Sequence, residues 1–244
     1  ATRDYKVRYA QTLLGYGWSI IQPLASVAVL FLVFKKMMGI EAEGISYLPY
    51  VMSGLLLWNY FNFVISQSAS ALLNAQNMIR KIYFPKICLP LSKAIVGLVA
   101  PLVGFLILIL LISQESNSNW WGLLFFFPAL IITSFASMGI GLWTSALSIR
   151  FRDLQQIIPY VLQILFFLTP IAYSSKLANS LVPESMEFIL YLNPMTGIIE
   201  SYRSLLFGTM ASPFIWISYA MSLLLFISGL RYFQKIEMKI ADII

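Results

Sequence analysis

Few residues in this chain belong to the types that carry out acid–base, nucleophilic or metal chemistry. Its 244 residues include no histidine and one cysteine, Cys88. Without histidine there is no Ser–His or Cys–His nucleophile, no H-E-x-x-H zinc site and no histidine ligand for haem. A single cysteine excludes an intramolecular disulfide and a cysteine-based metal site within one chain. An intramembrane enzyme would need a carboxylate near the interface, and the plausible ones, Asp153 and Glu200, lie in no recognisable catalytic motif.

The chain also lacks the usual means of capturing energy. It contains no G-x-x-x-x-G-K-[ST] phosphate loop and no G-x-S-x-G elbow. Its long apolar segments carry no Asp, Glu, Lys or Arg, the residues that mark proton and ion relays inside membranes. We therefore expect a conduit that is not an enzyme, holds no cofactor and receives its driving force from a partner.

Composition predicts a membrane-spanning frame for these residues. Hydrophobic residues make up 59% and charged residues 11% of the chain, against roughly 45–50% and 25% in soluble domains. A helix needs about 20 apolar residues to cross a bilayer. We predict an all-α membrane protein with a single transmembrane domain over 1–244, whose six uncharged spans cover about 17–34, 48–73, 94–112, 120–147, 157–175 and 213–230.

The distribution of basic residues predicts the topology, because Lys and Arg favour the cytoplasmic side. With both termini inside, the inner segments hold twelve of the sixteen basic residues: Arg3, Lys6, Arg8, Arg80, Lys81, Lys86, Lys93, Arg150, Arg152, Arg231, Lys235 and Lys239. This favours an N-in, C-in arrangement. Lys35 and Lys36 depart from the rule, since they follow the first span on the outer side and would have to snorkel to the headgroups.

The segment before the first span predicts a short helix lying on the inner membrane surface. Over residues 3–16 the charges cluster near the start, while Tyr5, Tyr9 and Leu13 can share an apolar face. Such a pattern is typical of an interfacial amphipathic helix. The alternative is a disordered basic leader.

The second inner loop, residues 74–93, carries four basic residues and no acid. Asn74 or Asn77 could cap a short helix that runs to about Tyr83, where Pro85 stops it. The loop has the size of an element that transmits force to a cytoplasmic partner, although a plain positive-inside turn explains the charge equally well. The residues predicted to make that contact are Asn77, Met78, Ile79, Arg80 and Lys81.

The segment 176–212 predicts outer half-helices rather than a full span. Asn193 is a good N-cap, Pro194 suits the first helical position, and Gly208 can end the helix. The resulting helix of about 14 residues would be roughly 21 Å long, which is short for a span. Non-helical backbone at membrane depth must be covered by protein or face a water-filled path, so this segment is a candidate gate.

Within this helix two charged residues lie three positions apart. Glu200 and Arg203 would then fall on one face, where we expect them to pair. The predicted gate residues are Asn193, Pro194, Glu200 and Arg203.

Three segments, taken in order, resemble the permease subunits of polysaccharide ABC exporters of the ABC-2 type. Residues 3–34 carry R-D-x-K-x-R-Y, then Q-T-x-L-G, then W-S-x-x-x-P. Residues 150–173 (RFRDLQQIIPYVLQILFFLTPIAY) are similar to the family's junction between the fourth and fifth spans. Residues 192–208 (LNPMTGIIESYRSLLFG) are similar to its N-P-x-T-x-x-x-E-x-x-R segment. Within the family the resemblance is greatest to the Wzm-type O-antigen exporters.

The resemblance implies a homodimer of six-span subunits in the bacterial inner membrane, joined to two copies of a cytoplasmic ABC ATPase that binds ATP and Mg. It also implies that the loop 74–93 contacts the ATPase and that the helices of 176–212 form an outer gate. The expected substrate is an undecaprenyl-pyrophosphate-linked polysaccharide. Membrane lipids are expected partners, and nucleic acid is not.

If a glycan passes through, aromatic side chains are its expected lining. The chain has 37 of them, 15% of its length, and their ring faces can stack on the C–H faces of sugars without trapping the chain. The predicted lining residues are Trp18, Trp58, Tyr60, Tyr160, Phe166 and Tyr173. The alternative is that these rings meet lipid or the protein core.

The basic residues of the first segment admit two roles under this resemblance. Arg3, Lys6 and Arg8 can pair with the pyrophosphate of a lipid carrier. They can equally attract anionic bilayer lipids.

Other functions stay open from the sequence alone. Capsule and teichoic-acid permeases share the same plan, and a small-molecule or drug permease shares the six spans. An intramembrane enzyme acting on lipid-linked sugars and a non-enzymatic scaffold are further alternatives.

Overall fold

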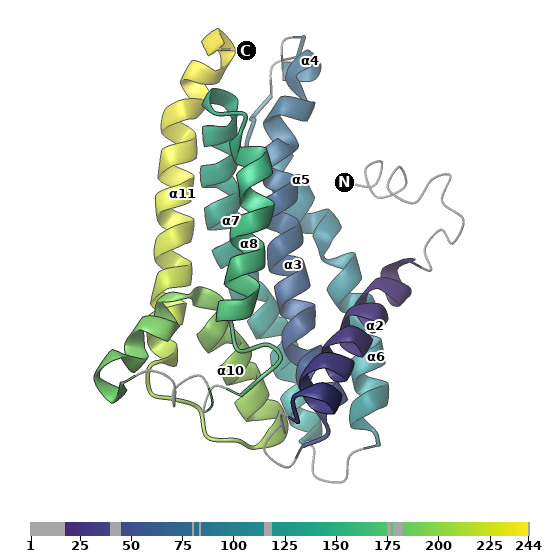
Figure 1. The fold of residues 1–244 in the computed structure, drawn as a ribbon. Coiled ribbons are helices and arrows are strands. Elements are labelled where there is room, and N and C mark those ends of the chain that lie inside the picture. The colour runs from purple at the N-terminus through teal and green to yellow at the C-terminus, as the bar shows by residue number, and fades with distance from the viewer. Residues whose placement is uncertain are drawn as a thin grey trace.

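The computed structural model describes residues 18–39, 45–79, 81–82, 84–114, 119–174, 177 and 183–243. Within these ranges the chain folds as a bundle of helices and contains no β-strand. The long helices α3 (Tyr47–Asn74), α7 (Phe126–Arg150) and α11 (Ile215–Ile243) run side by side along its length (Figure 1).

Four helical stretches among the described residues are long and apolar enough to cross a membrane. They are Tyr47–Asn74, Cys88–Ile112, Trp120–Arg150 and Ile215–Glu237. The second consists of α5 (Cys88–Gly97) and α6 (Val99–Ile112). The third begins with the 3₁₀ helix η3 (Trp120–Phe125) and continues as α7. These stretches coincide with the second, third, fourth and sixth predicted spans.

The first and fifth predicted spans are helical, but they differ from the other four. Helix α2 (Trp18–Leu30) continues into the π-helical η2 (Phe31–Met37) and lies obliquely beside α3 and α6 (Figure 1). Helix α8 (Leu154–Leu168) has 15 residues and ends well before the predicted limit of 175. Its end follows from Pro170, because the residue before a proline is disfavoured in helical conformation, and Thr169 is extended. The six-span count stays a prediction.

Helix α3 occupies the centre of the bundle. Side chains around its whole circumference are buried, among them Val51, Leu57, Phe61, Val64 and Leu72. A membrane helix that is covered on all sides must pack against several neighbours, and α3 contacts α2, α5, α6, α7, α8 and α10. The rest of the fold is therefore arranged around this one helix.

Helices α7 and α11 approach each other so closely that their backbones touch. A Cβ atom on Gly229 would collide with the carbonyl oxygen of Gly139, and one on Gly139 would collide with the backbone at Leu225. Small residues allow such contacts between membrane helices, where packing replaces the hydrophobic effect as the source of association. The two helices consequently form the tightest unit of the bundle.

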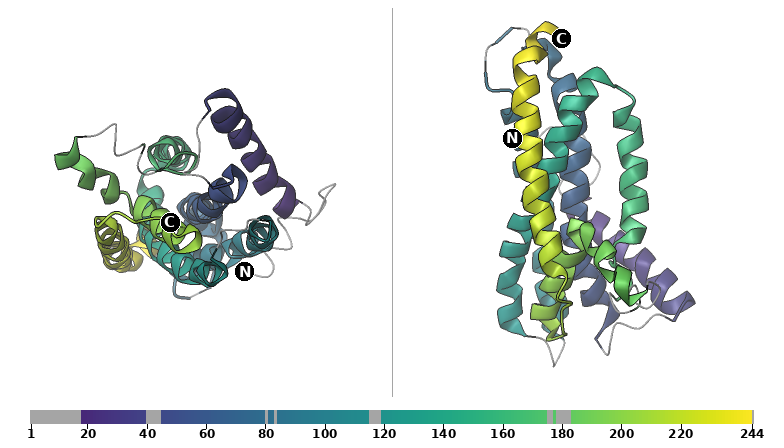
Figure 2. Two further views of the ribbon diagram at one scale, coloured as in Figure 1. Left: turned by 90° about the horizontal axis from the view of Figure 1, so that it is seen from below. Right: turned by 90° about the vertical axis from the view of Figure 1, so that its left-hand side faces the viewer.

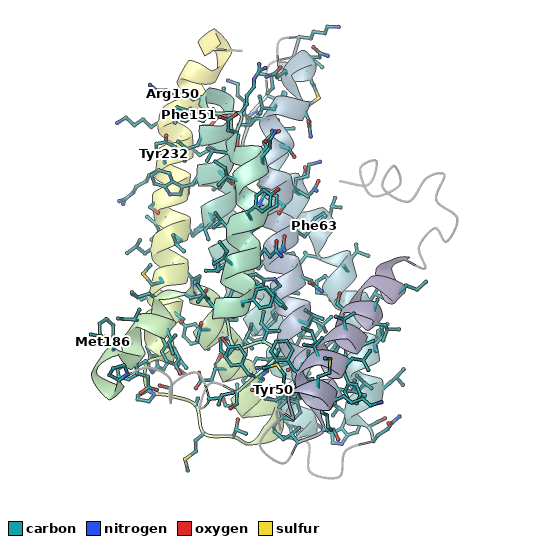
Figure 3. The ribbon with its side chains drawn as sticks, viewed as in Figure 1. Tyr50, Phe63, Arg150, Phe151, Met186 and Tyr232 are labelled. Atoms are coloured by element: carbon teal, nitrogen blue, oxygen red, sulfur yellow. The ribbon has the colours of Figure 1, made fainter. Side chains whose placement is uncertain are left out.

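The two ends of the bundle differ in their elements. One end carries α4 (Gln76–Ile79), the turn from α7 to α8 and the last part of α11 (Figures 1 and 2). Arg150 and Phe151 lie near this end, and Tyr50 lies near the other, where α10 (Pro194–Phe207) is found (Figure 3). The described parts of the predicted inner loops thus lie at one end of the bundle, and the N-in, C-in topology stays a prediction.

At that end the 74–93 loop is fastened to α11. The backbone N–H of Lys86 donates to Oε1 of Glu237 at 2.6 Å, and its Nζ donates to the Glu237 carbonyl at 3.0 Å. The helix predicted between Asn74 or Asn77 and Tyr83 is shorter than expected, since α4 has four residues.

Candidate functional site

Helix α10 is defined by local sequence signals at both ends. The Asn193 side chain accepts a hydrogen bond from the backbone N–H of Met195 at 3.1 Å, and Pro194 is the first helical residue. Gly208 ends the helix in the left-handed conformation, with φ of 70°. These observations confirm the predicted start, end and length of the helix. They leave its role as an outer gate a prediction.

Arg203, on α10, holds together two other elements. Its guanidinium donates to the carbonyls of Pro170 at 2.7 Å, Ile171 at 2.6 Å and Tyr50 at 2.9 Å. Its Nε donates to Oγ of Ser53 at 3.3 Å, and its Cζ lies 3.8 Å from the centre of the Tyr50 ring. The side chain is 4% exposed. Backbone carbonyls buried at membrane depth need a donor, and Arg203 supplies it where α8 has ended.

Glu200 uses other partners than the expected one. Its Oε2 accepts from the Tyr191 hydroxyl at 2.6 Å, and its Oε1 accepts from the backbone N–H of Ser212 at 2.7 Å. In the described part of the chain no ion pair joins Glu200 to Arg203, so the expected pairing is wrong. The reason is that the carboxylate faces the segments before and after α10, whereas the guanidinium faces α3 and the end of α8.

The irregular segment after α8 has further hydrogen-bond donors around it. Tyr47 donates its hydroxyl hydrogen to the carbonyl of Ala172 at 2.8 Å, and Tyr50 donates to that of Tyr173 at 3.3 Å. Nδ2 of Asn193 donates to Oγ1 of Thr169 at 2.7 Å. We call residues 169–173, α10 and the start of α3 the α10 cluster.

Helix α11 supports this cluster from the other side through Ser218. Its hydroxyl accepts from the backbone N–H of Gly197 at 3.1 Å and lies 2.8 Å from the Tyr191 carbonyl and 3.0 Å from that of Asn193. A Cβ on Gly197 would lie 2.6 Å from the Ser218 side chain, so only glycine fits there. The start of α10 is thereby fixed to α11.

A groove of about 530 Å³ lies between α2, α3 and α8. Its lining combines aromatic rings and carboxamides with small and aliphatic side chains: Ala25, Ser26, Val29, Leu30, Leu55, Trp58, Asn59, Asn62, Pro159, Leu162, Gln163, Phe166 and Phe167. No acidic or basic side chain is among them. We call this space the α8 groove.

Two of the predicted aromatic lining residues border the α8 groove. Trp58 is buried beneath it and meets Phe166 edge to face, with ring centres 5.6 Å apart. Tyr160 is on the uncovered side of α8 and is 69% exposed. Tyr173 is half-buried, and its hydroxyl donates to the Phe167 carbonyl at 2.8 Å.

The other predicted aromatic residues lie elsewhere. Tyr60 is buried, donates to the Ala94 carbonyl at 3.3 Å and lies 3.0 Å from Oγ of Ser134. Its ring borders an apolar cavity of about 410 Å³ formed by α3, α5, α7 and α11 and does not reach the α8 groove. The side chain of Trp18 lies outside the described residues.

The predicted contact residues of the inner loop lie at the basic end of the bundle. Asn77 and Met78 are exposed on α4, Ile79 is half-buried, and Lys81 is exposed. Arg80, the predicted helix 3–16 and its Arg3, Lys6 and Arg8 lie outside the described residues.

Sequence reasoning missed the carboxamides of the α8 groove. Asn59 and Asn62 are three residues apart in a span that is otherwise apolar at its centre, which was the available signal. Their convergence with Gln163 depends on how α3 and α8 pack. No group of three His, Cys, Asp or Glu side chains that could hold a metal occurs in the part of the chain that the structure describes.

The bundle thus combines long apolar helices, a basic end and a short capped helix at the opposite end. The family model for the ABC-2 type transporter matches residues 1–207, and the chain belongs to this family. It is a multi-pass protein of the bacterial inner membrane.

Curated relatives share nearly its whole length. The chain is 28% identical to the O-antigen export system permease protein RfbA of Klebsiella pneumoniae over 244 residues, which cover 99% of this chain and 92% of the relative. It is 28% identical to RfbA of Myxococcus xanthus over 207 residues, covering 84% and 77%. It is 22% identical to the polysialic acid transport protein KpsM of Escherichia coli over 205 residues, covering 82% and 77%.

Proposed function

We propose that this chain is the permease subunit of an exporter for lipid-linked polysaccharide of the O-antigen kind. Two copies would form the translocation path, and two copies of a separate ABC ATPase, which binds ATP and Mg, would drive it. The observation that carries the proposal is the similarity to O-antigen export permeases over 99% of the chain. The uncharged lining of the α8 groove agrees with it, since a long polar polymer must slide past the lining without being held by fixed charge.

The proposed dimer rests on the incomplete packing of α8. Of its side chains only Ile158 and Leu162 are buried, while glutamines and a tyrosine are exposed along it. Polar side chains are costly to place against lipid and usually face other protein or a water-filled path. A second copy that faces α8 across the path satisfies this requirement, and each copy would have six spans in the N-in, C-in arrangement.

The ATPase would bind at the basic end of the bundle, through the predicted contact residues 77–81. Met78 is exposed there on α4. The hydrogen bonds between Lys86 and Glu237 hold the loop against α11, so a force applied to the loop reaches a transmembrane helix directly. A cross-linker placed at position 78 or 81 should capture the ATPase.

The proposed outer gate is the segment 176–212, which contains α10. Its basis is the break after α8, where backbone carbonyls of Pro170 and Ile171 depend on one side chain of α10 for their hydrogen bonds. Movement of α10 would therefore change the conformation of the segment that follows α8. The interfacial helix 3–16, with Arg3, Lys6 and Arg8, would lie on the inner surface, where the lipid pyrophosphate or anionic lipids meet it.

A capsule polysaccharide is the second candidate substrate, and the similarity to a polysialic acid transport protein favours it. The lower identity, 22% against 28%, places it behind an O-antigen-like glycan.

Reconstitution tests the proposal. The permease is purified with its proposed partner, an ABC ATPase from the same organism, and placed in liposomes with a lipid-linked polysaccharide. We expect ATP-dependent movement of the glycan to the opposite leaflet, measured by its accessibility to a glycosidase, and none with an ATPase variant that cannot hydrolyse ATP. Movement of a small amphipathic dye, with no movement of any glycan, would assign the complex to drug export.

A further inference from the structure

One face of α8 carries amide and aromatic side chains in alternation. Gln156, Tyr160, Gln163 and Phe167 follow one another at intervals of four, three and four residues, and all four are exposed. At 100° per residue these positions stay within about 60° of one another, and they extend over about 16 Å of helix. They therefore form one continuous stripe along a helix that stands at the outside of the bundle (Figure 2).

The stripe meets two further carboxamides from the centre of the fold. Gln163 and Phe167 border the α8 groove, and Asn59 and Asn62 of α3 face them across it. In the part of the chain that the structure describes, neither Asn59 nor Gln163 makes a side-chain hydrogen bond within the subunit. The Oδ1 of Asn62 accepts from the Ser66 hydroxyl at 3.1 Å, which leaves its amide N–H donors available.

Lipid cannot be the permanent neighbour of these groups. An amide in the membrane without a hydrogen-bond partner costs free energy. Arg203 and Asn193 have such partners elsewhere in the same molecule. Polar atoms without a partner also occur outside the groove, among them Nε2 of Gln155 and the Tyr202 hydroxyl, but protein encloses these atoms and no ligand reaches them. The unsatisfied amides of the α8 groove are concentrated where a ligand can reach them.

The chemistry of the lining selects the ligand. A carboxamide both donates and accepts, so it pairs with a hydroxyl in either sense. Aromatic faces cover the apolar faces of a ring between its hydroxyls. The groove holds no Lys or Arg to bind a phosphate or carboxylate, and no Asp or Glu to bind a cation. Alternating amides and rings fit a chain of sugar rings whose surface is rich in hydroxyls and free of charge.

We propose that Asn59, Asn62, Gln156 and Gln163, with Tyr160 and Phe167, form a binding track for uncharged sugar rings of the polymer in transit. This inference rests on the proposed function and narrows its substrate class to neutral glycans. The amides hold each ring by hydrogen bonds that exchange as the chain advances. Neutral polymers are bound here, and polyanionic polymers are not.

The test uses the complete complex of permease and ATPase in liposomes and measures ATP hydrolysis as lipid-linked polymer is added. The probes are a lipid-linked mannose polymer and lipid-linked polysialic acid. The variant is the double substitution Asn59→Leu with Gln163→Met, which removes two amides at nearly constant volume. The matched control is Gln234→Met, because Gln234 is exposed on α11, which packs on α7.

With the native complex we expect stimulation by the mannose polymer and little by polysialic acid. The double variant should need about tenfold more mannose polymer for half-maximal stimulation, since two hydrogen bonds are lost, while its basal ATP hydrolysis and the control variant stay unchanged. The single variant Gln163→Asn keeps an amide at this position and a native Asn59. It should therefore need less polymer for half-maximal stimulation than the double variant.

Three outcomes overturn the inference. A double variant with native polymer dependence means that the amides do not bind the glycan, and the proposed function survives. Equal stimulation by both polymers removes the selection for neutral glycans. Loss of the dimer in the double variant, seen by cross-linking, means that the second copy occupies the groove. Failure of every polymer to stimulate the native complex contradicts the proposed function itself.

Discussion

The α10 cluster and the α8 groove are both polar regions inside an apolar protein, and they differ in how the charged groups of one and the carboxamides of the other are paired. In the cluster, Arg203 and Glu200 are buried, and each makes two or more hydrogen bonds within the subunit. In the groove, Asn59 and Gln163 are left without partners in the described part of the chain. The cluster thus holds its own backbone in place, whereas the carboxamides of the groove stay available to a ligand.

The difference has a physical basis in what each region must withstand. The cluster encloses a stretch of chain that has left the helical conformation, and its carbonyls need permanent donors. A permanent partner in the groove would compete with a moving polymer. Substitutions in the two regions should accordingly separate stability from transport.

The largest effect is expected at Arg203. Replacing it by Met leaves the carbonyls of Tyr50, Pro170 and Ile171 without their donor, at a cost of about 1–3 kcal/mol for each buried group. We expect the folded fraction to fall sharply, as measured by size-exclusion chromatography in detergent after heating. The exposed Arg152 provides the control, since Arg152→Met removes the same charge from the surface. Native behaviour of Arg203→Met would show that the cluster does not depend on this side chain.

A smaller loss of stability is expected at Glu200. Glu200→Gln keeps one oxygen to accept a hydrogen bond but loses the charge that strengthens the contacts with Tyr191 and Ser212. Hydrogen bonds to charged groups contribute about 1.5–3 kcal/mol, so we expect a loss of about 1–2 kcal/mol. Unfolding by a graded increase of denaturing detergent gives the value. A free energy equal to that of the native protein would mean that the charge of Glu200 does not strengthen these two contacts.

The start of α10 should be less sensitive still. Asn193→Ala removes the cap on Met195 and the hydrogen bond to Thr169, with an expected cost of about 1 kcal/mol. Asn193→Asp keeps the cap but lacks the N–H donor to Thr169. Its free energy of unfolding should therefore lie between those of the native protein and of Asn193→Ala. The same detergent titration ranks the three proteins, and a different order would separate the cap from the tertiary contact.

The smallest effect on stability is expected in the groove. Gln163→Met and Asn59→Leu remove groups that have no partner within the subunit, so the free energy of unfolding should change by less than about 0.5 kcal/mol. The double variant should nevertheless need about tenfold more glycan for half-maximal stimulation of ATP hydrolysis, as described above. A loss of stability as large as that of Asn193→Ala would show that the groove is part of the structural core and would remove the contrast between the two regions.

Local sequence signals determined what could be predicted. The Asn193 cap, Pro194 and the Gly208 terminator act within a few residues of one another, and α10 begins and ends where they indicate. The second, third, fourth and sixth predicted spans likewise follow from uninterrupted apolar sequence. The end of α8 was misplaced because hydrophobicity continues beyond Leu168, although Pro170 had already marked the break.

What could not be predicted depends on partners far away in the sequence. Arg203 contacts Tyr50, which is 153 residues away, and nothing near Arg203 announces that choice. The i, i+3 spacing to Glu200 favoured a local pair instead. Tyr60 is similar, since its direction toward Ala94 and Ser134 follows from how α3 packs on α5 and α7.

Helix α11 connects the 74–93 loop to the start of α10 along one long helix. It has 29 residues, about 43 Å, and is stiffened along its side by the backbone contact between Gly229 and Gly139. Toward one end of α11, Glu237 accepts a hydrogen bond from the 74–93 loop. Toward the other end, Ser218 accepts one from the start of α10. These two positions are about 28 Å apart along the helix. A movement of the 74–93 loop along the axis of α11 would therefore move the start of α10 by nearly the same distance. Spin labels on the loop and on α10 that keep a fixed separation through the ATPase cycle would show such rigid transmission, and a changing separation would rule it out.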